Sequence, residues 1–207
     1  MPYQTFFNLP EVKCQRLMDA VWQEFTTVSY NEASINKIIQ AAGISRGSFY
    51  QYFAGKQDLF SYLLTTVYTA GKQMFTAQLM AHSNNLFSAI LGMYDMILWK
   101  KSKGRFTDEQ RKIHCLIRLN FDMDLTQFLT YMDTDSMARS IREVLRQSGY
   151  MVENLEECYA LLNMLAAVAI SNLADTMRHP PNEQRNRRFL EHQLLIIRRG
   201  LATYQSE

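Results

Sequence analysis

Residues 34–53 of the chain read SINKIIQAAGISRGSFYQYF, and this stretch decides the predicted fold. Ser34 can cap a short helix whose apolar residues fall on one face: Ile35, Ile38, Ile39 and Ala42. Gly43 is suited to end that helix in the left-handed conformation, and Ser45 can cap the next one. Two short helices joined by so tight a turn must cross steeply. The stretch therefore predicts a helix-turn-helix whose second helix can enter a DNA major groove.

The second helix of this motif is expected to have two different faces. Phe49 and Phe53 lie four residues apart and should point together into the core. The opposite face and its rims carry small, polar or hydroxyl-bearing residues: Gly47, Ser48, Tyr50, Gln51 and Tyr52. An ordinary solvated helix more often carries Glu and Lys there, so this face suits contact with base edges and phosphates.

Helical periodicity extends on both sides of the motif. Asn8, followed by Pro10 and Glu11, resembles a helix start, and one apolar stripe follows it: Cys14, Leu17, Met18, Val21 and Phe25. A long helix from residue 57 to about residue 79 should link the motif to the rest of the chain. With only 4 Pro and 8 Gly among 207 residues, the whole chain reads as helical. The predicted fold class is all-α, with an N-terminal three-helix helix-turn-helix module and a C-terminal antiparallel helical bundle.

Residues 10–62 resemble the DNA-binding domain of the TetR/AcrR family of regulators. The resemblance is carried by residues 34–53, by Lys56, Leu59 and Phe60 after them, and by residues 17–21 and 25 of the first helix. Mild departures from the family pattern occur at Ser29, Ile39 and Phe49. The resemblance implies a helix-turn-helix DNA-binding domain at residues 1–55 and a ligand-sensing and dimerisation domain at residues 56–207. It also implies a homodimer that binds a double-stranded DNA operator, more often as a repressor.

The predicted DNA-binding residues lie at the cap positions and on the exposed face of the motif: Ser34, Ser45, Arg46, Gly47, Ser48, Tyr50, Gln51, Tyr52 and Lys56. Gln51 and Ser48 are expected to set sequence preference. A second group is expected to hold the DNA backbone: Ser34, Arg46, Tyr50 and Lys56. Arg46 and Lys56 each sit in the first turn of a helix, where a cation opposes the macrodipole, and a nearby phosphate would explain that placement.

The overall charge neither supports nor excludes a nucleic-acid partner. The net charge is +2, and the first 60 residues carry five basic against five acidic side chains. Affinity for phosphate must therefore come from local placement. The same neutrality is the best support for an alternative function, a helical ligand-binding or scaffold dimer that has lost DNA binding.

Enzyme chemistry, metals and membranes find little support in the sequence. Residues 43–47 fit the G-x-S-x-G pattern of hydrolases, but that pattern needs a strand before it, and residues 35–42 have helical periodicity, so Ser45 is interpreted as a cap. The three cysteines, Cys14, Cys115 and Cys158, stand far apart, which predicts no metal and no cofactor. Without a run of roughly 18 uncharged residues or a signal peptide, we expect a cytoplasmic protein with no membrane partner.

A small-molecule effector is expected to bind in the middle of the chain. Residues 86–132 are rich in Met and aromatic side chains, each of which could simply be core, but which together suit an apolar pocket with a few polar handles. Neutral or cationic aromatic-containing compounds are favoured, because Asp95, Asp122 and Asp124 are near enough in sequence to supply negative charge. The candidate lining residues are Tyr94, Trp99, His114, Phe121 and Phe128.

The last two predicted helices, residues 155 to about 177 and 183 to about 204, are expected to form a homodimer. Leu190, Leu194, Ile197 and Leu201 make one apolar stripe, which Phe189, Leu195 and Ile196 widen beyond what one neighbouring helix can cover. Small residues on the preceding helix, including Ala166 and Ala169, permit close approach. A four-helix interface between two copies of the chain follows as a prediction.

Overall fold

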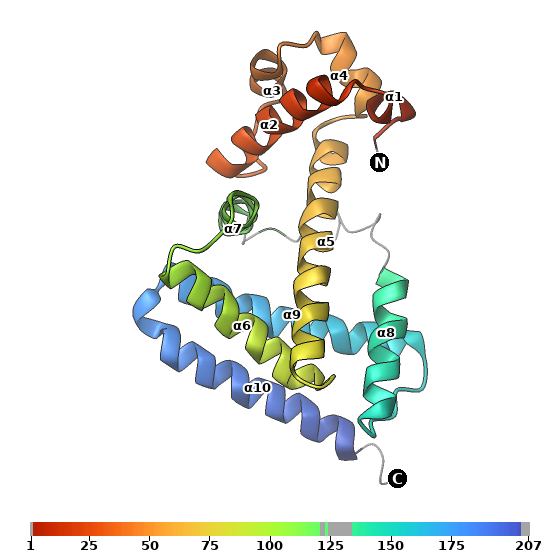
Figure 1. The fold of residues 1–207 in the computed structure, drawn as a ribbon, viewed down its shortest axis with the longest axis vertical. Helices are drawn as coiled ribbons and strands as arrows, with labels where there is room; N and C mark the ends of the chain where they lie inside the picture. Colours follow the sequence, from red (N-terminus) through yellow and green to blue (C-terminus); the bar gives the residue numbers. More distant parts are fainter. Residues whose placement is uncertain (1, 121–122, 124–133, 204–207) are drawn as a thin grey trace. The chain divides into compact units, whose positions relative to one another are not determined.

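The computed structural model describes residues 2–120, 123 and 134–203, and all regular structure in these ranges is helical (Figure 1). The helices in chain order are α1 (Gln4–Phe7), α2 (Glu11–Thr27), α3 (Ile35–Ala42), α4 (Arg46–Tyr52), α5 (Lys56–Ala81), α6 (Leu86–Ser102), α7 (Asp108–Leu119), α8 (Thr134–Gln147), α9 (Leu155–Arg178), the short 3-10 helix η2 (Pro180–Asn182) and α10 (Glu183–Thr203). The predicted all-α class is confirmed.

The chain divides into two compact units. The first unit comprises Met1–Thr69 and Phe106–Met132, and the second comprises Ala70–Arg105 and Asp133–Glu207. The first unit thus takes in the beginning of α5 and the segment that contains α7, both of which lie beyond the expected boundary at residue 55. The assignment of DNA binding to residues 1–55 and of sensing to residues 56–207 stays a prediction.

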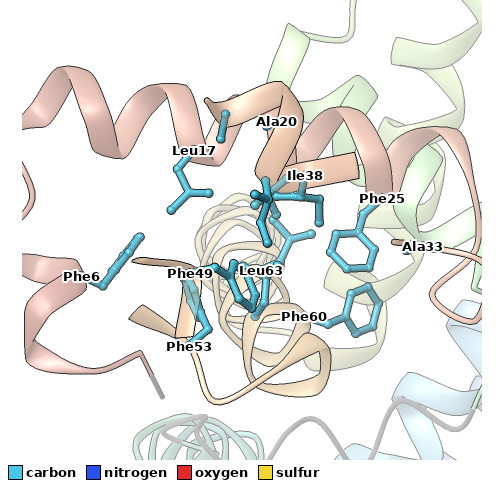
Figure 2. Close-up of a cluster of buried hydrophobic side chains, with 14 of the residues drawn as sticks. Phe6, Leu17, Ala20, Phe25, Ala33, Ile38, Phe49, Phe53, Phe60 and Leu63 are labelled. Atoms are coloured by element: carbon cyan, nitrogen blue, oxygen red, sulfur yellow. The ribbon is translucent and has the colours of Figure 1, made fainter. Parts of the chain in front are cut away.

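Aromatic side chains dominate the core of the first unit (Figure 2). Phe25, Phe49, Phe53 and Phe60 are all fully buried, so the predicted inward face of α4 is confirmed. The sequence did not reveal α1, which brings Phe6 against the ring of Phe53 at a centroid distance of 4.9 Å. The expected helix start at Asn8 is wrong, because this residue ends α1 and α2 begins only at Glu11.

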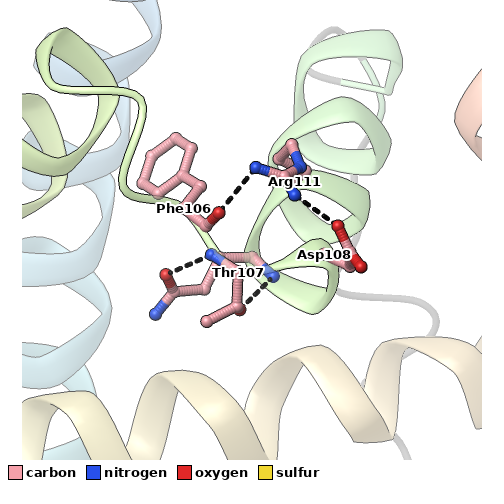
Figure 3. Close-up of polar contacts among 5 residues, drawn as sticks. Phe106, Thr107, Asp108 and Arg111 are labelled. Carbon is pink, nitrogen blue, oxygen red and sulfur yellow. Dashed lines mark hydrogen bonds and ion pairs between the residues drawn. The ribbon is translucent and has the colours of Figure 1, made fainter.

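One side chain of this core comes from far along the chain. Leu116 of α7 is 1% exposed and belongs to the same cluster of buried residues as the helices of the helix-turn-helix. At its other end α7 begins with a capping box, in which Thr107 Oγ1 accepts from the Gln110 backbone N–H and Gln110 Oε1 accepts from the Thr107 N–H, each at 3.2 Å (Figure 3). Arg111 donates to the Phe106 carbonyl at 2.7 Å and pairs with Asp108. The start of α7 is therefore held by local polar contacts.

The second unit is built around α6, α8, α9 and α10. Its core includes Leu98, Ile141, Leu161 and Leu194 from these four helices. A polar contact also joins two of these helices. Arg187 of α10 forms a bidentate ion pair with Asp95 of α6, with N···O distances of 2.7 and 2.8 Å. Two parallel N–H···O bonds fix the relative rotation of the two helices more strictly than a single bond would.

Candidate nucleic-acid interface

The turn between α3 and α4 has the geometry that the sequence predicts. Gly43 adopts the left-handed conformation with φ 63° and ψ 39°, and its N–H donates to the Gln40 carbonyl at 3.2 Å. Glycine adopts this conformation without the steric cost that a Cβ atom adds. Ser45 then begins α4, and its Oγ accepts from the Ser48 backbone N–H at 3.0 Å. The predicted cap at Ser45 is confirmed.

The solvent-facing side of α4 is formed by small and polar residues. Arg46, Gly47, Tyr50 and Gln51 are all exposed. A Cβ atom at Gly47 would meet only the Ser45 hydroxyl, at 3.8 Å, so the helix backbone is open to close approach from outside. The short helix therefore offers a guanidinium, a phenol and an amide to a partner surface, beside the single position Gly47 that has no side chain.

The two flanking positions contribute less to this face. Ser48 is half-buried, and its hydroxyl lies 2.8 Å from the Ser45 hydroxyl. Tyr52 is also half-buried and packs against the aromatic core. Their predicted contacts with DNA stay predictions, with less free surface than Gln51 has.

A hollow of about 230 Å³ lies where the N-termini of α3, α4 and α5 converge. It is lined by Ala33, Ser34, Ile35, Asn36, Arg46, Tyr50 and Lys56. These include all four residues that the sequence assigns to the DNA backbone. Arg46 donates to Asn36 Oδ1 at 3.0 Å, and its guanidinium carbon lies 5.7 Å from the centre of the Tyr50 ring. The structure thus brings together residues from three helices at one place.

The charge balance of the hollow differs from that of the domain around it. Two cations and no carboxylate are among its seven lining residues. Two acidic side chains lie near it: Glu24 accepts from the backbone N–H of the lining residue Ser34 at 2.9 Å, and Asp58 accepts from the Ala54 N–H at 3.0 Å. The lining residues themselves carry a positive charge, although the first 60 residues are neutral overall.

Ser34 stands at the cap position of α3 without acting as the expected cap. Its backbone is extended, as an N-cap requires, but its side chain makes no capping hydrogen bond. The expectation of a hydroxyl cap is therefore wrong, while the backbone N–H of Ser34 itself donates to Glu24 Oε1. The hydroxyl lines the hollow, where it can serve as a donor to an anion.

Lys56 has a role that the sequence did not reveal. Its Nζ donates to the carbonyls of Tyr30, Asn31 and Ala33, at 2.9, 3.2 and 3.1 Å, and lies 4.7 Å from the centre of the Tyr30 ring. An ammonium group has three donors, so these carbonyls use all of them. We therefore revise the expected phosphate contact: Lys56 clamps the turn between α2 and α3 and adds positive charge to the hollow.

The comparisons with known proteins agree with this geometry. Residues 17–63 match the model of a family described as bacterial regulatory proteins, tetR family. The N-terminal domain belongs to the TetR family. The chain is also 23% identical over 180 residues to the uncharacterized HTH-type transcriptional regulator YdgC of Bacillus subtilis (strain 168), which covers 80% of this chain and 84% of that protein.

Two solved structures described as tetR-family transcription regulators share the fold. The one from Shewanella sp. PV-4 has a TM-score of 0.60 at 15% identity, covering 88% of this chain and 95% of that chain. The one from Mesorhizobium loti MAFF303099 has a TM-score of 0.52 at 16% identity, covering 89% of this chain and 94% of that chain. At these identities the likeness shows a shared fold, and the helix-turn-helix lies within residues 17–63, the part of the chain that matches the family model.

The predicted effector residues fall in different places. Tyr94 is 3% exposed in the second unit, where its hydroxyl lies 2.7 Å from Thr176 Oγ1, and burial raises the pKa of its phenol. Trp99 is 48% exposed, and the Arg105 guanidinium lies 5.0 Å from its ring centre. His114 belongs to the first unit. Phe121 and Phe128, like Asp122 and Asp124, lie outside the described residues.

The predicted dimer stripe on α10 needs a correction. Leu190 and Leu194 are 0% and 3% exposed within a single chain, so the prediction that they face a second copy is wrong. Ile197 and Leu201 pack against the same internal core and are only partly exposed. The helical spacing indicated an apolar stripe correctly, but the stripe is covered by the chain's own helices.

A second apolar face remains exposed on α9 and α10. It includes Met164 and Ile170 on α9, at 54% and 52% exposure, and Phe189 and Ile196 on α10, at 59% and 67%. Residues 158–174 carry no charged side chain. Ala166 is exposed on this helix, while Ala169 packs partly against the internal core. Leu195, which the sequence also placed on the wider face, is 39% exposed.

By length and composition α9 would also suit a membrane span, and it is the one such helix within the described ranges. The core helix of a soluble protein passes the same criterion. Its inner face packs in the core of the second unit through Cys158, Leu161 and Leu165. The helix thus has one face buried in the core and an outer face that carries no charge over residues 158–174.

Proposed function

We propose that the chain is a homodimeric transcriptional repressor that inserts α4 into the major groove of a roughly palindromic DNA operator. The observation that supports this most is the hollow lined by Ser34, Arg46, Tyr50 and Lys56, beside the exposed face of α4. A positive hollow with hydroxyl and guanidinium donors suits a phosphate oxygen, while α4 beside it suits base edges. Arg46, Tyr50 and Ser34 make the backbone contacts, and Lys56 contributes charge and position.

Gln51 is proposed as the main reader of sequence. Its side chain is exposed on α4, and its amide can pair in a bidentate manner with adenine N6 and N7. Ser48 is less accessible because its hydroxyl lies beside that of Ser45. Gly47 supports the arrangement, because a helix without a side chain at this position can approach the groove floor closely.

The homodimer is proposed to form through the outer faces of α9 and α10. Phe189 and Ile196 lie two turns apart on one face of α10, and α9 carries no charged side chain from residue 158 to residue 174. A monomer would leave this surface exposed to water, whereas in a two-fold dimer the same surface of the second copy would cover it. The two α4 helices of the dimer would then contact half-sites about one turn of the DNA helix apart, roughly 34 to 36 Å.

We further propose that a small, mainly apolar molecule alters operator affinity. The support is the Met and aromatic content of residues 86–132 and the helix α5, which runs unbroken from the hollow into the second unit. A ligand that shifts α5 would change the separation of the two α4 helices, to which DNA binding at a fixed spacing is sensitive. As a regulator acting on DNA, the protein would work in the cytoplasm.

Binding-site selection tests the proposal directly. Purified protein is mixed with a random duplex library and with genomic fragments, and recovered sequences are titrated between 50 and 200 mM salt. We expect one palindromic motif and an affinity that falls steeply with salt, since each neutralised phosphate adds about 0.9 to the slope. Recovery of no motif, with no salt-dependent binding, would instead support the helical scaffold dimer that has lost DNA binding.

A further inference from the structure

The turn between α2 and α3 is held from two sides by residues that lie outside it. Lys56 binds three carbonyls of this turn, among them that of Tyr30. On the other side, Asn120 Oδ1 accepts from the Tyr30 backbone N–H at 2.7 Å. The N–H and the C=O of the same residue are thus fixed by two different side chains, so Tyr30 has little freedom to shift.

Asn120 is well placed to act as a rigid acceptor. It ends α7, is 2% exposed, and its Nδ2 donates to the Leu116 carbonyl at 2.8 Å. Leu116 itself is buried in the aromatic core of the first unit. Because one end of the amide is anchored on the helix, its oxygen has a fixed position, and a fixed acceptor stabilises a single position of its donor.

The turn that Asn120 holds leads directly into the hollow. Ala33, Ser34 and Ile35 follow Tyr30 within a few residues and line it, as does Lys56. A shift of Tyr30 would therefore move both the start of α3 and the carbonyls that Lys56 binds. The geometry of the backbone-binding site depends on this turn.

From these contacts we infer that Asn120 is a positioning residue for DNA binding, acting through Tyr30 on the hollow formed by Ser34, Arg46, Tyr50 and Lys56. It lies outside residues 17–63, the part of the chain that matches the TetR family model. The inference rests on the proposed function, but its first step, the Tyr30 contact, can be measured without DNA. It makes the operator affinity depend on a residue from the segment after α6.

The test compares three variants with the wild-type chain. Asn120→Leu removes both hydrogen bonds at similar volume, and Asn120→Asp keeps an acceptor for the Tyr30 N–H while losing the donor to Leu116. The matched control is Asn172→Leu, because Asn172 is 5% exposed in the second unit and its Nδ2 binds both the Val168 carbonyl and Gln193 Oε1, each at 2.7 Å; light scattering checks that this variant keeps the mass of the wild-type protein. If Asn120→Leu does not fold, Asn120→Ala takes its place.

Two quantities are measured on each variant: hydrogen exchange of the Tyr30 amide without DNA, and affinity for a duplex recovered by selection with the wild-type protein. Asn120→Leu should expose the Tyr30 amide and weaken binding about tenfold, as expected for a lost buried hydrogen bond that is coupled to the site. The salt slope should fall by about 0.9, the equivalent of one phosphate contact. Asn120→Asp should keep the Tyr30 protection and most of the affinity, and Asn172→Leu should leave both unchanged.

Three results would overturn the inference. Unchanged affinity in Asn120→Leu with an exposed Tyr30 amide would show that the turn does not govern the hollow. A loss of affinity in Asn120→Asp as large as in Asn120→Leu would show that the acceptor is not what matters, and an equal loss in Asn172→Leu would reduce the effect to general destabilisation. Absence of DNA binding by the wild-type chain would contradict the proposed function alone, since the Tyr30 exchange would still report the clamp.

Discussion

Replacing Lys56 by arginine separates a clamp from a phosphate contact. A phosphate contact tolerates Lys56→Arg, because arginine also binds phosphate. A clamp does not, because a planar guanidinium cannot direct three donors to the three carbonyls that surround Nζ. Lys56→Met serves as the second variant, since it keeps the apolar stem and removes every donor. The exposed Lys37→Met on α3 is the matched control.

The size of the effect follows from the three hydrogen bonds. A hydrogen bond to a charged group contributes about 1.5 to 3 kcal/mol, but Lys56 is only half-buried and water can replace part of the loss, so we expect about 1 to 3 kcal/mol in total. Both Lys56→Arg and Lys56→Met should lower the stability of the first unit by this amount. Neither should remove a phosphate contact, so the salt slope should change by much less than 0.9.

Urea unfolding followed by tryptophan fluorescence gives the stability. Trp22 lies in the first unit and Trp99 in the second, so a Trp99→Phe background makes the signal specific for the first unit. The clamp would be refuted if Lys56→Arg were as stable as the wild type while Lys56→Met lowered the salt slope by about 0.9. In that case the direct phosphate contact expected from the sequence would be correct.

Three further predictions concern sequence preference, assembly and the turn. Gln51→Ala should relax the choice at one base-pair position, costing about 1 to 3 kcal/mol on the preferred base; an unchanged motif after binding-site selection would remove Gln51 from the reading face. Ile196→Glu should give a monomer by light scattering at micromolar concentration, whereas Val12→Glu, at an 80% exposed apolar residue of α2, should not change the mass; a dimeric Ile196→Glu protein would place the interface elsewhere. Gly43→Ala should destabilise the first unit by about 1 to 2 kcal/mol through backbone strain alone, since its Cβ would meet Arg16 only at an ordinary 3.9 Å. Equal stability of Gly43→Ala and the unstrained control Gly55→Ala would contradict that reason.

The local features of the helix-turn-helix could be predicted because they depend on neighbours in sequence. The left-handed Gly43, the Ser45 cap and the inward Phe49 each follow from spacing and residue type within a few positions. The four-residue α1 was missed because a short segment offers too few residues for a period to be recognised. Its docking depends instead on Phe6 meeting Phe53, a contact that no local pattern reveals.

Side-chain contacts between distant segments explain the remaining differences. The sequence predicted a phosphate contact for Lys56, because a cation at the start of a helix is electrostatically unfavourable. In the structure, three carbonyls of the α2–α3 turn accept hydrogen bonds from its Nζ and offset that unfavourable interaction. Leu190 and Leu194 have the spacing of an interface stripe, yet a stripe alone does not say which neighbour covers it. Thr107 and Gln110 mark the start of α7 in the sequence, whereas nothing near Asn120 indicates its contact with Tyr30, 90 residues away.

The contribution of α7 to the first unit has a consequence for how such regulators can be recombined. A fragment that ends after residue 69 would contain the helix-turn-helix but would lack Leu116 in its core. It would also lack Asn120, whose Oδ1 accepts from the Tyr30 amide. Joining that fragment to the remainder of a related protein would leave the core around Leu116 without its matching side chain. Transfer of the helix-turn-helix domain to a related protein would then succeed only if the segment around residues 108–120 were transferred with it. The alternative is a recipient that already has an equivalent segment. The compact unit that carries the helix-turn-helix is thus built from two separated stretches of the chain.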